Sequence, residues 1–228
     1  MLKGQDGEAK RGTRDNYSQL CVLLIAGPSG SGKSTFIDAL RSDQLPLQLR
    51  NSFPVDVASW PAFEANDVLK RGDNYQKLHP DLFEKRGVIL HYDTFFIHRA
   101  GLSSYAEDPI WPIITTAAKL YVVSIEPTAS QLQDQFFERF HLHMKSKGVM
   151  RSAWHRLVKR RMRQLNYKLF RKGMPDSASL YKSTDTIESW QGRWEQALSS
   201  LTFIKAENRL VRIKPCRDQD GQNTYVMK

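Results

Sequence analysis

Residues 21–35 read CVLLIAGPSGSGKST. The six apolar residues at 21–26 precede a glycine, which is typical of a strand that is buried on both faces of a parallel sheet. After the glycine-rich turn, apolar residues recur at helical spacing over 34–41. A buried strand, a glycine loop and a helix in this order predict the first strand–helix unit of an α/β domain.

The loop itself, GPSGSGKS at 27–34, matches the pattern G-x-x-x-x-G-K-[ST] at every fixed position. Its glycines allow backbone angles and close approaches that a Cβ would prevent. Successive backbone N–H groups, together with the unpaired N–H groups of the first helical turn, then form a site for phosphate oxygens. We therefore predict that nucleotide phosphates are bound by residues Gly27, Ser29, Gly30, Ser31, Gly32, Lys33, Ser34 and Thr35.

Three side chains have expected roles in such a site. Lys33 would neutralise the β and γ phosphates, and the Ser34 hydroxyl would be a ligand of Mg²⁺. A second metal-holding group is expected at Asp93, because this acid ends the apolar strand pattern at 87–93. The same position also suits an acid that caps the helix starting near 94–96, and this alternative stays open.

The loop resembles those of the P-loop NTPase superfamily (Walker A motif), and it is most similar to the loops of guanylate kinases. The segment IEPT at 125–128, which leads into Leu132 and Arg139, is also similar to a strand-to-helix junction in such kinases. The resemblance implies the three-layer P-loop NTPase fold and kinase-like phosphoryl transfer with Mg²⁺ and ATP. GTP is the alternative donor, and the acceptor is left open because the acceptor-binding pattern of guanylate kinases does not occur.

Further strands are expected at 53–57, 118–125 and 209–213. A mostly helical stretch is expected at 62–86, and long helices at 129–147, 151–172 and 186–200. Together with the strand at 87–93, this alternation predicts an α/β fold with a parallel sheet of about five strands flanked by helices. Asp56 and Glu126 would lie at strand ends, where either acid could orient the acceptor or act as a general base, or could be a solvated loop acid.

The predicted organisation has three parts. Residues 1–18 read as a flexible N-terminal tail and 216–228 as a C-terminal tail, because both are polar and lack periodicity. The segment between them, 19–215, would be the P-loop NTPase domain, including a helical lid at about 139–172.

The positive charge of the chain is concentrated in that lid segment. Residues 139–172 contain 12 basic and no acidic residues, whereas the other 22 basic residues are balanced by 24 acidic ones, for a net charge of +10. We expect lid arginines, Arg160 and Arg163 above all, to stabilise charge in the phosphoryl-transfer transition state. The alternative partner of this segment is nucleic acid or another polyanion.

Other features of the sequence limit which class of protein this is. The chain has 228 residues, two cysteines, a polar N-terminus and no apolar run near the roughly 20 residues that span a bilayer. We therefore expect a cytoplasmic protein without a transmembrane segment. The expected activity is that of a P-loop kinase or NTPase, and the alternative is an NTPase that acts as a nucleic-acid-binding or regulatory switch protein.

Overall fold

The computed structural model describes residues 19–65, 87–108, 110–135, 183–202, 209–217 and 223–228. The chain divides into two compact units, one formed by Met1–Glu126 with Trp194–Lys228 and the other by Pro127–Arg193. The predicted N-terminal tail at 1–18 and the predicted lid at 139–172 lie outside the described residues.

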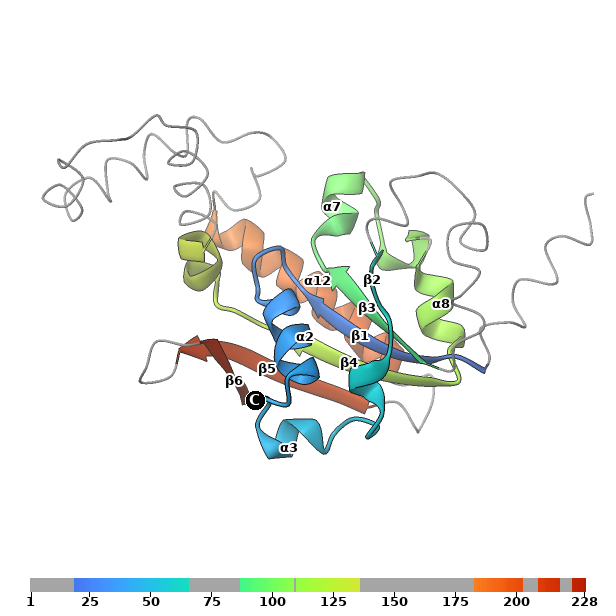
Figure 1. The fold of residues 1–228 in the computed structure, drawn as a ribbon. Coiled ribbons are helices and arrows are strands. Elements are labelled where there is room, and N and C mark those ends of the chain that lie inside the picture. The colour runs from blue at the N-terminus through green and yellow to red at the C-terminus, as the bar shows by residue number, and fades with distance from the viewer. Residues whose placement is uncertain (1–18, 66–86, 109, 136–182, 203–208, 218–222) are drawn as a thin grey trace, which may run out of the picture. The chain divides into compact units, whose positions relative to one another are not determined.

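The described strands form one six-stranded sheet in the order β2-β3-β1-β4-β5-β6 (Figure 1). Neighbouring strands pair in parallel except β5 and β6, which are antiparallel. The α/β class is therefore confirmed, and the sheet has one strand more than the predicted five. The strands are β1 (Cys21–Gly27), β2 (Ala62–Glu64), β3 (Gly87–Asp93), β4 (Lys119–Ile125), β5 (Arg209–Arg217) and β6 (Asn223–Met227).

The three central strands, β3, β1 and β4, are apolar almost throughout, because both faces of the sheet are covered at this point. Helix α2 (Lys33–Arg41) packs Phe36, Ile37 and Leu40 on one face, together with α3 (Leu47–Arg50). The strand residues in this core are Leu23, Ile25, Ile89, Val123, Ile125, Val211, Ile213 and Tyr225.

The alternate residues of the strands face the other side of the sheet. Here the 194–202 part of α12 (Thr184–Thr202) is packed, and the Trp194 indole N–H donates to Ser124 Oγ at 3.0 Å. The Trp194 ring also contacts Tyr92 of β3 and Tyr105 of the short 3-10 helix η3 (Tyr105–Glu107), with centroids 5.9 and 5.2 Å apart. Helices α7 (Phe96–Ala100) and α8 (Trp111–Thr116) complete the connection from β3 to β4.

The prediction of a strand at 53–57 is wrong. This segment forms turns and the 3-10 helix η2 (Val57–Ser59), and the strand in this part of the chain is β2, within a range expected to be mostly helical. Pro54 lacks the N–H that a ladder needs, whereas the Pro61 carbonyl accepts a hydrogen bond from Ile89 N at 2.8 Å and leads β2 onto β3.

The predicted C-terminal tail is also corrected. Strand β5 runs through Pro215 to Arg217, and β6 follows it where a frayed end was expected. Proline is tolerated in β5 because β4 ends opposite Ile213, so that among the described strands β6 alone pairs with β5 beyond this residue.

Candidate phosphate-binding site

The glycine loop folds as a tight turn between β1 and α2. Gly32 has φ of +95°, a left-handed conformation that other residues rarely adopt. Gly27 is required for a different reason, since a Cβ there would lie 2.9 Å from the carbonyl oxygen of Ile125 and would also collide with the Ser31 side chain. The conformation and packing of the loop therefore explain why glycine is needed at both positions.

The Lys33 side chain is folded back along the loop. It is only 4% exposed, and its Nζ donates to the carbonyl oxygens of Gly27 and Pro28, both at 2.7 Å. These two residues are the first and second of the loop motif. The contacts hold an ammonium charge at the beginning of α2, where the helix dipole also contributes positive potential.

The start of α2 has the features of an anion site. The N-cap of α2 is Gly32, so no side chain of the N-cap residue bonds the first helix N–H groups. The first turn also contains no acidic residue. Ser34 and Thr35 are exposed, as hydroxyls that meet a ligand must be. Ser31 Oγ is fully buried in the loop and, among the described residues, has no hydrogen-bond partner. A buried hydroxyl without a partner costs free energy. A Cβ built on Gly27 would lie 2.5 Å from Ser31 Oγ, so this atom is packed against the Gly27 backbone inside the loop.

Asp93 lies beside the loop. It is the register partner of Gly27 in the adjacent strand, and the following Thr94 N donates to the Gly27 carbonyl at 3.2 Å. The side chain is 4% exposed, and Oδ1 accepts a hydrogen bond from Phe95 N at 3.0 Å. The acid therefore caps the turn before α7, and this role is compatible with an additional one toward a metal.

A second buried acid stabilises the loop after Asp93. Asp108 is 1% exposed and accepts hydrogen bonds from the Tyr92 hydroxyl at 2.7 Å and from Ile110 N at 3.0 Å. Burial raises the pKa of the Asp108 carboxyl, and burial together with the nearby Asp108 charge raises the pKa of Tyr92. Tyr105 donates its hydroxyl to the Thr94 carbonyl at 2.7 Å, which fixes the backbone next to Asp93.

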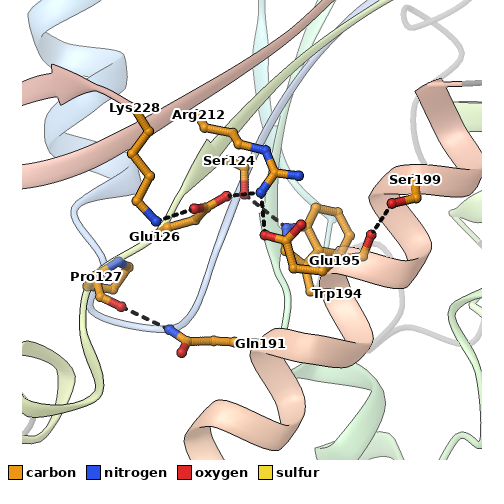
Figure 2. Close-up of polar contacts among 9 residues, drawn as sticks. All are labelled: Ser124, Glu126, Pro127, Gln191, Trp194, Glu195, Ser199, Arg212 and Lys228. Carbon is orange, nitrogen blue, oxygen red and sulfur yellow. Dashed lines mark hydrogen bonds and ion pairs between the residues drawn. The ribbon is translucent and has the colours of Figure 1, made fainter.

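Glu126, at the end of β4, belongs to an ion-paired cluster (Figure 2). Its carboxylate is 13% exposed and lies 2.6 Å from Lys228 Nζ and 3.4 Å from an Arg212 guanidinium nitrogen. Arg212 also binds Glu195 at 2.5 Å, and this hydrogen bond is the main reason that the pKa of Arg212 is raised. Glu126 is therefore not the solvated loop acid that was one of its alternatives.

Asp56 does not lie at a strand end. It is exposed, precedes η2 and accepts a hydrogen bond from the Trp60 indole N–H at 3.1 Å. The expectation that a strand places this acid at the site edge is wrong, because the strand itself is absent.

The structure thus brings together the loop residues 27–35 and Asp93, whereas Arg160 and Arg163 lie outside the described residues. One residue near the loop escaped prediction: the Tyr225 hydroxyl donates to the Gly32 carbonyl at 2.8 Å. No local signal marks this tyrosine, because the contact joins residues 193 positions apart. Within the described ranges, no three His, Cys, Asp or Glu side chains form a group that could hold a metal ion by themselves.

Comparison with family models, curated proteins and solved structures gives no match for this chain. In the part of the chain that the structure describes, no helix has the length and apolar character needed to cross a membrane.

Proposed function

We propose that this protein binds a nucleoside triphosphate with Mg²⁺ and transfers the γ-phosphate to an acceptor, as kinase-like members of the P-loop NTPase superfamily do. ATP is the proposed donor, with GTP as the alternative. The observation that carries the proposal is the position of Lys33, whose Nζ is bound by the Gly27 and Pro28 carbonyls at the start of α2, beside Asp93. This arrangement offers a fixed cation and helix N–H groups to a polyphosphate.

The donor set also suits Mg²⁺. This ion prefers oxygen ligands, keeps several waters and is usually held by one or two carboxylates together with substrate phosphates. The Ser34 hydroxyl and the Asp93 carboxylate would supply the protein oxygens, so a dedicated cluster of acids is not required. When bound, the metal would neutralise charge that develops on the transferred phosphoryl group.

The chain's own residues would do the rest by positioning and electrostatics. Lys33 and the loop N–H groups would hold the β and γ phosphates. The role of arginines from the 139–172 segment in stabilising transition-state charge, with Arg160 and Arg163 as candidates, stays a prediction. A cytoplasmic location also stays a prediction.

The test is thermal unfolding with magnesium ATP, magnesium GTP and ATP in EDTA. Ligand at 100 times its dissociation constant should add about 2.7 kcal/mol to the free energy of unfolding. Lys33→Ala should abolish this gain, whereas Lys214→Ala, which removes an exposed lysine from β5, should leave it unchanged. Wild-type protein that gains no stability with either nucleotide would contradict the proposal.

A second candidate function rests on the 12 basic and no acidic residues at 139–172. An NTPase that binds nucleic acid through this segment would show an affinity that falls log-linearly with salt concentration. That binding would survive Lys33→Ala, because it does not use the loop. Turnover assays with hydroxyl or phosphate acceptors separate the two: phosphorylated acceptor supports the kinase, and release of free phosphate supports the NTPase.

A further inference from the structure

The C-terminal strand β6 reaches the phosphate loop through Tyr225. The hydroxyl of this residue donates to the Gly32 carbonyl oxygen at 2.8 Å, and its side chain is buried. Its ring meets the Phe36 ring of α2 edge-on, with centroids 5.2 Å apart. Burial raises the pKa of Tyr225, so the hydroxyl keeps its proton and remains a donor at physiological pH.

The acceptor of this bond occupies a critical position. The Gly32 carbonyl also receives the first hydrogen bond of α2, from Phe36 N at 2.9 Å. It shares a planar trans peptide unit with the backbone N–H of Lys33, so the two groups point in opposite directions. Fixing the Gly32 oxygen therefore fixes the direction of the Lys33 N–H, one of the first helix N–H groups that have no intrahelical acceptor.

We propose that Tyr225 is a positioning residue for the phosphate-binding loop: by holding the Gly32–Lys33 peptide, it orients a backbone N–H toward the bound phosphates. This inference rests on the proposed function. The Gly32 oxygen is thus held from two sides, by Phe36 N of α2 at 2.9 Å and by the Tyr225 hydroxyl of β6 at 2.8 Å. Donation to the carbonyl also polarises the peptide and strengthens its N–H as a donor.

The mechanism makes a specific prediction about ligands. Tyr225 acts through the peptide that meets phosphate and not through the nucleoside, so its loss should weaken nucleotide and bare polyphosphate equally. A residue that contacted the base or ribose would weaken only the nucleotide. A residue that merely stabilised the fold would lower the unfolding temperature without a matching loss of affinity.

The experiment measures the dissociation constants of magnesium ATP and magnesium tripolyphosphate by calorimetry. Tyr225→Phe removes the hydroxyl and keeps the ring against Phe36, so the variant should fold, which circular dichroism and the unfolding temperature verify. The matched control is Ser42→Ala at the other end of α2, where an exposed hydroxyl donates to the Asp38 carbonyl at 2.7 Å. Both variants lose one hydroxyl-to-carbonyl bond on the same helix.

We expect Tyr225→Phe to weaken both ligands by the same factor, roughly three- to tenfold, the loss of one net hydrogen bond. Ser42→Ala should bind both ligands as the wild type does. Unchanged affinity in Tyr225→Phe, or a loss confined to ATP, would overturn the inference while leaving the proposed function intact. Wild-type protein that binds neither ligand would instead remove the proposed function, and the inference with it.

Discussion

Gly27 and Asp93 are register partners in the adjacent parallel strands β1 and β3, so the first residue of the glycine loop lies directly beside the acid that ends the next strand. The Thr94 N–H closes this edge by donating to the Gly27 carbonyl at 3.2 Å. The ends of parallel strands meet at one edge of a sheet, which is where open α/β sheets bind their ligands. The pairing therefore places Asp93 next to the proposed phosphate site.

Asp93→Asn should separate the two roles of this acid. The amide oxygen of asparagine still accepts the Phe95 N–H, so the turn is preserved, but the charge that would hold Mg²⁺ is lost. We expect the affinity for magnesium ATP to fall about tenfold or more, with little change for ATP in EDTA. Thermal unfolding under both conditions measures this, with Asp38→Asn, an exposed acid on α2, as the control. If magnesium changes the affinity for ATP equally in the two variants, Asp93 has only its turn-capping role.

Gly32→Ala should destabilise the protein. Alanine at a φ of +95° is strained by about 1–2 kcal/mol, and its Cβ would lie only 3.3 Å from the Tyr225 hydroxyl oxygen. Gly192→Ala is the matched control, since this glycine of α12 has no atom within 4 Å of the added Cβ. There the substitution should raise the free energy of unfolding by about 0.5–1 kcal/mol. Urea unfolding of both variants measures the difference, and changes of the same sign would refute the explanation.

Asp108 should make stability depend on pH. Burial raises its native pKa above the ordinary value of 3.8, so the native state binds more protons than the unfolded chain between these two values. The contribution of Asp108 to stability is therefore complete below about pH 3.8 and is lost as the pH rises through the native pKa. Asp108→Asn removes this titration but keeps a side chain that hydrogen-bonds Tyr92. In urea unfolding across a pH series, the free energy of unfolding should fall less with rising pH in the variant than in the wild type. Identical pH dependence of the two free energies would contradict the assignment.

The Arg212–Glu195 pair should contribute little to stability. The two side chains are 34% and 40% exposed, and water and salt screen such pairs. A double-mutant cycle with Arg212→Gln and Glu195→Gln should give a coupling free energy below about 1 kcal/mol at low salt, decreasing as salt is added. Coupling that is unaffected by salt would show that the pair is more strongly shielded from solvent than its exposure indicates.

Elements with a strong local pattern were predictable. The strands β1, β3 and β4 are continuous apolar runs, and α2 and α12 show helical spacing, so periodicity locates them within a residue or two. The edge strands were not predictable, because their stability comes from one neighbouring strand and not from their own composition. β2 has only three residues, and β6 lies in a polar segment without periodicity, a pattern that is typical of a tail.

The sequence by itself determined the glycine loop, its lysine and the acid at the end of β3, because each depends on residue types within a short segment. The tertiary structure alone decided which groups surround them. Glu126 meets Arg212 and Lys228 across 86 and 102 positions, and Tyr225 meets Gly32 across 193. Such contacts follow from strand order and register, which the folded chain establishes only when distant apolar faces are buried together, and no local pattern encodes them.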